Sequence, residues 1–224
     1  MATEKRNPGK FTIVELIGYG EVFVEQASDA AAPAVLTIEA DEALISRIGS
    51  EVRGNRLRLG LTMPWYEWFS FGWTWLFSPK KIAYRLTAPA IEGLEITGSG
   101  TMTAAELKTE RCALVLRGSG TLRFHGSVTR ILSSLITGSG VIECRGSADN
   151  HEIRLTGSGG IRATELEARQ VSVRITGSGG VKVFARESLD VAITGSGSVV
   201  YSGQPKLQTR VTGSGSVRQE KGSR

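Results

Sequence analysis

The side chains best suited to acid–base chemistry are scarce in this sequence. His125 and His151 are the only histidines among the 224 residues. The internal repeat of the chain places them in different columns, one facing outward and one facing inward, and no carboxylate recurs beside either of them. General acid–base catalysis needs titratable groups held together within hydrogen-bonding reach of the substrate. The histidines therefore do not indicate a catalytic site.

Other catalytic and metal-binding patterns are also missing. A pectinase-like acid site needs carboxylates clustered on one face of the protein. The glycine corners contain no Asp, which a calcium-binding nonapeptide roll requires, and neither zinc-ligand spacing nor a P-loop occurs. We therefore predict that the protein is not an enzyme and has no cofactor and no metal site. The aspartates are scattered through the chain: Asp29, Asp41, Asp149 and Asp190.

Basic residues provide a candidate binding stripe. The position three after each Gly-Ser-Gly tripeptide faces outward, and four of these seven positions are basic. Regular spacing of cations could match a repeating polyanion, although a solvated face is the competing interpretation. The net charge of +5 and the pI of about 9.4 favour acidic partners such as anionic lipid or a polyanionic glycan, and nucleic acid is less favoured. The candidate polyanion contacts are Arg123, Arg162, Lys182 and Arg218.

A repeat positions these residues. The tripeptide Gly-Ser-Gly occurs seven times between residues 94 and 217, in steps of 20, 20, 19, 20, 18 and 18 residues. Such a regular period indicates one structural unit stacked on itself. The tripeptides begin at Gly98, Gly118, Gly138, Gly157, Gly177, Gly195 and Gly213.

Alternating apolar residues flank every tripeptide. The residues two positions before and two positions after it are always apolar, for example Leu116 and Leu122. Alternation with a period of two predicts short strands with one buried face, joined at a glycine corner. Strand–corner–strand units without helical spacers can coil so that each turn lies parallel to the previous one. The sequence predicts an all-β fold, a right-handed parallel β-helix of about seven to eight coils.

This pattern resembles the bacterial head GIN domain family, a domain of unknown function that is named after putative auto-transporter adhesins. The matching segments are "ITGSG" at 96–100, 136–140, 175–179 and 193–197, "YSGQPKLQTRVTGSGSV" at 201–217, and "IEADEALISRI" at 38–48. The resemblance covers about residues 11–218. It implies a β-helical protein of the bacterial surface or envelope, and it brings no catalytic residues.

The sequence predicts four regions along the chain. We predict a flexible N-terminus at 1–10 and a flexible C-terminus at 219–224, with the coils of the β-helix at 94–218. Residues 11–93 contain a divergent first coil and an N-terminal β-rich elaboration placed between that coil and the main stack. Within it, Asp41 is expected to cap a short helix, and residues 50–61 form a hairpin turning at Gly54 and Asn55.

The segment 64–81 contains all four tryptophans of the chain. It could close the open end of the β-helix core, form a contact with a partner or a second copy, or enter a bilayer interface, where Trp and Tyr settle beside lysines. The sequence leaves these three interpretations open. The candidate partner or membrane contacts are Trp65, Tyr66, Trp68, Phe69, Phe71, Trp73, Trp75, Phe77, Lys80 and Lys81.

Cysteine usage and targeting signals give further expectations. Cys112 and Cys144 fall in different columns of the repeat, so we predict two buried free thiols rather than a disulfide. The sequence shows no apolar stretch long enough for a spanning helix and no signal peptide, so it is cytoplasmic as written. The family resemblance instead implies the cell envelope.

The leading functional hypothesis is a non-catalytic module that presents an extended β-helical surface for adhesion or assembly. The expected partner is a protein or glycan surface, or a second copy in an oligomer. The first alternative is a peripheral scaffold that docks on an anionic membrane through the Trp-rich segment and basic residues. A polysaccharide-active enzyme is the weaker alternative.

Overall fold

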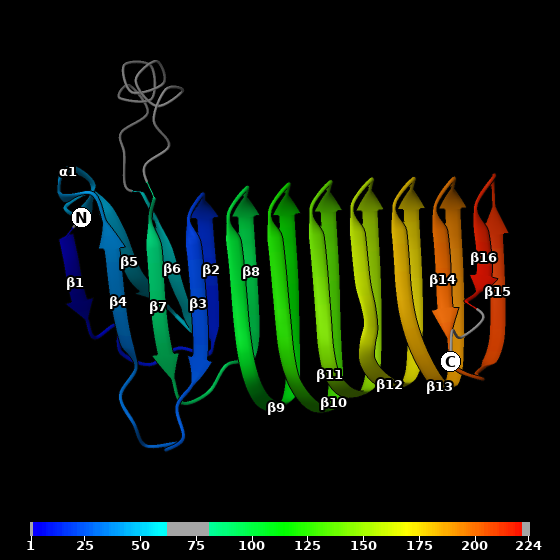
Figure 1. Cartoon of the computed structure of the whole chain (residues 1–224), viewed down its shortest axis with the longest axis horizontal. Helices are drawn as coiled ribbons and strands as arrows, with labels where there is room; N and C mark the ends of the chain where they lie inside the picture. Colours follow the sequence, from blue (N-terminus) through cyan, green and yellow to red (C-terminus); the bar gives the residue numbers. More distant parts are fainter. Residues whose placement is uncertain (1, 62–80, 221–224) are drawn as a thin grey trace, which may run out of the picture.

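The computed structural model describes residues 2–61 and 81–220. About 75% of it is strand, and it forms a parallel β-solenoid of about six turns (Figure 1). The predicted all-β parallel β-helix is therefore confirmed, but its coil count is slightly lower than the predicted seven to eight. The C-terminal end is made of the short strands β14 (Ser198–Ser202), β15 (Lys206–Thr212) and β16 (Ser216–Gln219).

Each central coil is one long bent strand. These strands are β9 (Thr101–Gly118), β10 (Thr121–Gly138), β11 (Val141–Gly157), β12 (Gly160–Gly177) and β13 (Gly180–Gly195). A register shift near the middle of β9–β12 marks the bend, such as the one between Val128 and Ile131. The first halves pair in parallel in one layer, here called the first sheet. The second halves pair in a facing layer, here called the second sheet.

The core lies between these two layers. Inward residues of successive coils stack in columns, as Leu122 does on Ile142 and Ile136 on Leu155. All four of these side chains are at most 1% exposed. Burying a side chain of this size contributes about 1.5–3 kcal/mol, so each coil is stabilised mainly by the two coils beside it.

The Gly-Ser-Gly corners require glycine at their first position. Gly138 has a φ of +126°, and a Cβ added to it would lie 2.5 Å from the carbonyl oxygen of Gly118 in the previous coil. The backbone N–H of Ser139 donates to that same carbonyl, with an N–O distance of 3.0 Å. The positive φ and the close approach therefore occur together, and only glycine meets both conditions.

The N-terminal region extends both layers. The first coil consists of β2 (Ile13–Gly18) in the second sheet and β3 (Glu21–Gln26) in the first, and β8 (Gly93–Gly98) pairs with both β2 and β9. Beyond this coil, β7 (Ala83–Ala88), β4 (Val35–Ala40) and β1 (Ala2–Arg6) continue the first sheet. The strands β6 (Arg56–Leu61) and β5 (Ile48–Arg53) continue the second sheet.

Two predictions about this region were wrong. The elaboration lies outside the first coil, at the end of the rod, and not between that coil and the main stack (Figure 1). Residues Ala2–Arg6 do not form a flexible start, because they pair with β4 as an antiparallel edge strand. The Arg6 guanidinium donates to the carbonyl of Ile48 at 2.7 Å and to Ser50 Oγ at 2.9 Å. These bonds join the edges of the two sheets and hold β1 in place.

Short-range predictions in the same region were confirmed. Asp41 caps the helix α1 (Glu42–Ile45) by accepting a hydrogen bond from the backbone N–H of Ala43 at 3.0 Å. The strands β5 and β6 form the expected antiparallel hairpin around Gly54 and Asn55. The helix also directs Leu44, which is 1% exposed, into the core. It thus covers part of the apolar interior at this end of the rod.

The corner glycines yield a stability prediction. Replacing Gly138 by Ala should lower the free energy of unfolding by more than about 2 kcal/mol, because it adds strain at positive φ to a collision with backbone. Gly160 is the matched control: its φ is not positive, and an added Cβ would have its nearest neighbour at 3.7 Å. Gly160→Ala should change stability by less than about 1 kcal/mol. Urea unfolding followed by circular dichroism measures both variants, and equal losses would contradict this explanation.

Candidate binding surface

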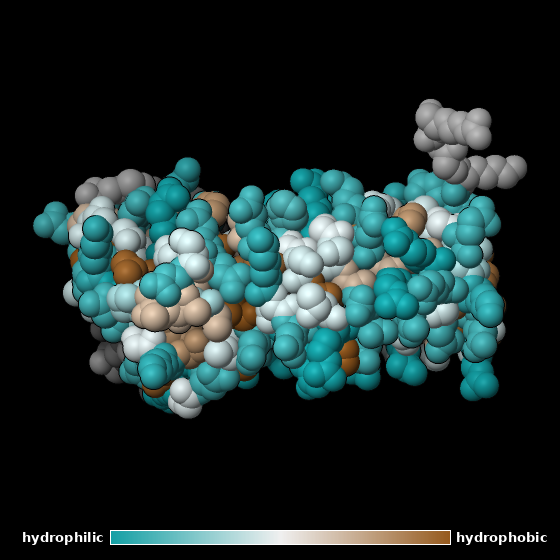
Figure 2. Space-filling model, turned by 90° about the horizontal axis from the view of Figure 1, so that it is seen from below, coloured by the Kyte–Doolittle hydropathy of each residue, from teal (hydrophilic) through white to brown (hydrophobic). Residues whose placement is uncertain are grey.

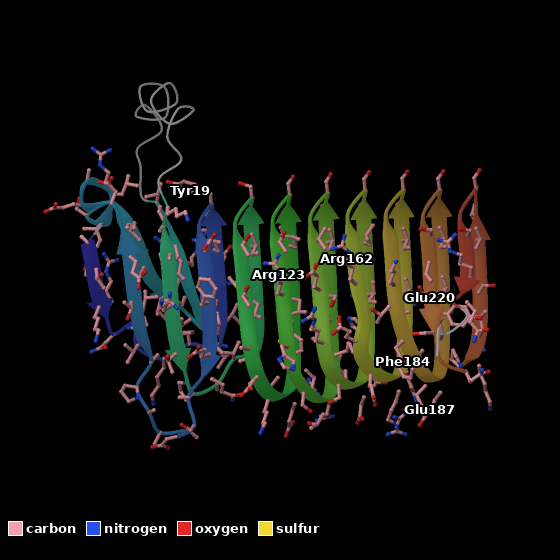
Figure 3. All side chains as sticks on the ribbon, in the orientation of Figure 1. Tyr19, Arg123, Arg162, Phe184, Glu187 and Glu220 are labelled. Carbon is pink, nitrogen blue, oxygen red and sulfur yellow. The ribbon has the colours of Figure 1, made fainter. Side chains whose placement is uncertain are left out.

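The predicted basic residues form one outward column on the first sheet. Backbone pairing aligns Arg123 with Glu143, Glu143 with Arg162, and Arg162 with Lys182. Val200 follows Lys182, and Arg218 then ends the column on β16. Five strand spacings separate Arg123 from Arg218, which is about 24 Å along the rod. Figure 3 labels Arg123 and Arg162, which lie two coils apart with Glu143 on the coil between them.

Glu143 neutralises part of this column. It accepts a hydrogen bond from Arg123 Nε at 3.2 Å and another from Arg162 Nη1 at 2.9 Å. Both arginine side chains remain at least half exposed. Lys182 and Arg218 are exposed and have no ion-pair partner within residues 2–61 and 81–220. The positive charge is therefore concentrated toward the C-terminal half of the column.

A row of small residues lies next to the basic column, two positions earlier in each strand. Gly160 and Gly180 sit in it with ordinary backbone angles and with nothing closer than 3.6 Å to an added Cβ. Neither the backbone nor steric crowding demands glycine at these first residues of β12 and β13. Their effect is a flat shelf beside the cations. Its members are Val141, Gly160, Gly180, Ser198 and Ser216.

Sequence reasoning missed this shelf, although a signal for it was present. The tripeptide is followed by an additional glycine in two coils, which gives "GSGG" at 157–160 and 177–180. The first glycine of each run is required by its positive φ, but the fourth is not. An unforced glycine in a strand often marks a place where another molecule approaches closely.

On the edge of the rod opposite the glycine corners, the charged side chains of the bends form ion pairs with one another. Arginines and carboxylates of neighbouring coils alternate there, as in the pairs Arg169–Glu187 at 2.9 Å and Arg186–Glu167 at 3.0 Å. Arg145 and Glu165 form a third pair at 3.3 Å. Figure 2 shows that hydrophilic residues cover most of this edge toward the C-terminal half. This edge therefore offers little net charge to a partner.

The outer face of the second sheet contains a compact charge network. Glu95 is 7% exposed and lies between Arg56 and Arg117, while Arg58 pairs with Glu15 at 3.1 Å. The network connects β6 of the elaboration with β2, β8 and β9. It satisfies the nearly buried carboxylate of Glu95, so these arginines stabilise the fold rather than remain available for a ligand.

Most of the Trp-rich segment 64–81 lies outside the described residues. Trp65, Trp68, Trp73 and Trp75, together with Tyr66, Phe69, Phe71, Phe77 and Lys80, lie outside the described residues, whereas Lys81 is described and exposed. The segment connects the end of β6 to the start of β7, where other coils have a glycine corner. Within the described ranges, no helix has the length and apolar character needed to cross a membrane.

His151 and the two cysteines are neighbours in the core, where Ser134 hydrogen-bonds to both His151 and Cys144, whereas His125 lies apart from them. His125 is exposed, whereas His151 lies in the core with its Nε2 atom 2.9 Å from Ser134 Oγ. Burial lowers the pKa of His151 to about 3, and its Nδ1 atom has no hydrogen-bond partner in the described structure. Cys112 and Cys144 are free and buried, as predicted, and burial raises both thiol pKa values to about 12.

Among the described residues, these side chains come together only inside the core. The Ser134–His151 pair is enclosed, so no substrate can reach it in the folded protein. An open depression of about 760 Å³ on the outer face of the second sheet is lined by Glu92, Arg111 and Glu152 among others, and by neither histidine. In the part of the chain that is described, no three His, Cys, Asp or Glu residues are grouped to hold a metal.

Comparison with known proteins identifies the family. The profile of the "putative auto-transporter adhesin, head GIN domain" matches residues 10–205. The chain belongs to the head GIN domain family. No match is found among curated proteins. The family description supports a binding or adhesion-type role for this member.

Solved structures share the fold of this GIN domain. An adhesin from Bacteroides fragilis, described as putative, superposes with a TM-score of 0.83 and 22% identity. A putative lipid binding protein from Parabacteroides distasonis gives a TM-score of 0.72 and 23% identity, and a putative adhesin from Parabacteroides merdae gives 0.71 and 18%. Each alignment covers 98% of this chain and 96% of the other. At these identities the similarity establishes the fold.

The buried histidine predicts a pH dependence of stability. His151 has a pKa of about 3 when folded and an ordinary value near 6.5 when unfolded. Only the unfolded chain therefore binds this proton between those values. The contribution of neutral His151 to the free energy of unfolding is complete above pH 6.5. It decreases as the pH falls toward 3, by up to about 1.4 kcal/mol per pH unit.

Urea unfolding between pH 7 and pH 5 measures this effect. The double variant Ser134→Ala/His151→Leu, which removes both hydrogen-bonding partners, should show a shallower loss of stability on acidification. His125→Gln is the control: it removes the other histidine of the chain, which is exposed, and should leave the slope unchanged. An unaltered slope in the double variant would contradict the assignment.

Proposed function

We propose that this GIN domain is a non-catalytic binding module of the bacterial surface or envelope, and that the first sheet presents its binding face to an extended acidic partner such as a polyanionic glycan. The observation that carries this proposal is the outward column of Arg123, Arg162, Lys182 and Arg218 beside the flat shelf at Gly160 and Gly180. Cations at regular intervals along a flat strip suit a linear polymer whose charges also repeat.

The contrast with the bends and with the Glu95 network supports this choice, although Arg174 and Arg210 on the second sheet also have no ion-pair partner among the described residues. Cations on the bends and in the Glu95 network are matched by neighbouring carboxylates. In the basic column, by comparison, a single glutamate serves two arginines, and Lys182 and Arg218 have no ion-pair partner among the described residues. A partner that binds here has to desolvate only free cations, which costs less free energy than separating an existing ion pair. The family's adhesin description supports the same class of role.

Fluorescence anisotropy with labelled heparin fragments, as a probe for a sulfated polyanion, tests the proposal. The double variant Lys182→Gln/Arg218→Gln should lose about two- to fivefold in affinity per removed cation at low salt. Gly180→Val should also weaken binding without changing the charge, because its side chain would fill the shelf. Raising the salt concentration should weaken binding of the unmodified protein.

The matched control is Arg174→Gln. Arg174 is exposed on the outer face of the second sheet and has no ion-pair partner in the described ranges, so this change removes one positive charge from the wrong face. It should leave heparin affinity unchanged. An equal loss in Arg174→Gln and in either column variant would show attraction to net charge alone and would refute the binding face.

A second candidate function is docking on an anionic membrane through the Trp-rich segment. It is favoured by the aromatic content of residues 64–81 and by the exposed Lys81 beside them. The related structure from Parabacteroides distasonis, described as a putative lipid binding protein, supports the same idea. Aromatic rings with adjacent lysines suit the headgroup region of a bilayer.

Co-sedimentation with vesicles of phosphatidylglycerol and phosphatidylcholine tests this candidate. Trp73→Ser/Trp75→Ser should abolish pelleting with the mixed vesicles, whereas Lys182→Gln/Arg218→Gln should retain it if the segment makes the contact. Vesicles of phosphatidylcholine alone serve as the uncharged control. Pelleting that is unchanged in the tryptophan variant would eliminate the segment as the membrane contact.

A further inference from the structure

The C-terminal coil ends in an uncovered strand. All seven residues of β15 are exposed, and among the described residues β15 pairs only with β13. Leu207 and Val211 are each 41% exposed, whereas Leu189 and Ile193, which precede them in the same inward columns, are 1% exposed. Among the described residues, none therefore covers these apolar columns at this end.

The N-terminal end is protected by a different arrangement. The edge strand β1 directs Glu4 and Arg6 toward the interior side, since they pair with Ile38 and Leu36, both 0% exposed. Glu4 and Arg6 form an ion pair at 2.8 Å, and Arg6 also bonds across to β5. Inward-facing charges on an edge strand prevent another chain from extending the sheet.

The strand β15 has none of these protections. Its inward residues are Leu207, Thr209 and Val211, which pair with the buried Leu189, Val191 and Ile193. None of the three is charged, and the strand contains neither a proline nor a break in its pairing. Its two cations, Lys206 and Arg210, lie in outward columns. The edge therefore remains suited to pairing with another strand.

Two copies of β15 have complementary sequences when they run antiparallel. In an antiparallel pair centred on Thr209, Leu207 lies opposite Val211 of the second copy, and Gln208 lies opposite Arg210. Lys206 then faces Thr212. Apolar residues meet apolar residues on the interior side, and no like charges are opposed.

Neighbouring registers are unfavourable. Centring the pair on Gln208 sets Lys206 against Arg210, and centring it on Arg210 sets that arginine against its own copy. Sliding one copy along the other so that every pairing changes by one residue would place inward residues opposite outward ones. Direct opposition of like charges is destabilising, so Thr209 is the favoured centre.

We propose that two copies of this chain associate tail to tail through β15, in an antiparallel pair with a two-fold axis at Thr209. The second sheet then continues from one copy into the other, and Leu207 and Val211 become covered. The inward Glu4 and Arg6 oppose head-to-tail addition at the other end. The assembly therefore closes as a dimer instead of growing into a filament.

Sedimentation velocity over a range of protein concentrations tests the association. The unmodified chain should shift from monomer to dimer as concentration rises. Thr209→Lys should remain a monomer, because it introduces at the axis the kind of inward charge that protects β1. Thr129→Lys, the same change at an exposed residue of a bend, should dimerise as the unmodified chain does. Circular dichroism checks that both variants are folded.

Oxidative cross-linking tests the register. Two directly opposed residues have Cβ atoms about 4.5–5.5 Å apart, so Thr209→Cys should form a disulfide-linked dimer. Lys206→Cys should not, because its own copy would lie about 20 Å away. The native Cys112 and Cys144 are buried and do not compete. A chain that stays monomeric, cross-links equally at both positions, or assembles beyond a dimer would overturn the proposal.

Discussion

The structure depends on the contact between successive glycine corners. Each corner turns at positive φ and packs closely against the corner of the previous coil. A Cβ at its first glycine would collide with that backbone, as at Gly138 beside Gly118. The N–H of the following serine donates to the same carbonyl. This contact fixes where each coil begins relative to the previous one, and parallel pairing then keeps that register as far as the bend, where it shifts.

Because the register is kept within each sheet, corresponding residues of successive coils line up on both surfaces of that sheet. Inside, the columns produce a continuous apolar core that tolerates only isolated polar groups, such as the bonded pair of Ser134 and His151. Outside, the same rule aligns Arg123, Arg162 and Lys182 and places Gly160 beside Gly180. The proposed binding face thus follows from the same repeat that stabilises the interior.

Stacking has a consequence at the two ends, where a coil lacks one neighbour. At the N-terminal end, charged residues of β1, cross-sheet bonds from Arg6 and the helix α1 cover the interior. At the C-terminal end, the columns stop with Leu207 and Val211 exposed. The two ends of one rod therefore differ chemically, although every coil between them follows the same pattern. This difference gives the rod a direction in any assembly that it forms.

The sequence by itself determined the solenoid, the positions of its corners, the inward columns and the alignment of the basic stripe. These follow from local alternation and a fixed period, which need no knowledge of distant contacts. Only the tertiary structure decided where residues 27–61 and 81–90 lie, because strands with similar alternation do not reveal their partners. It also decided the fate of residues 2–6, whose polar sequence resembles a flexible tail until Arg6 meets Ile48 and Ser50, more than forty residues away. The neutralising role of Glu143 and the shelf at Gly160 likewise depend on neighbours in adjacent coils, since a side chain's charge and space are set by what packs beside it.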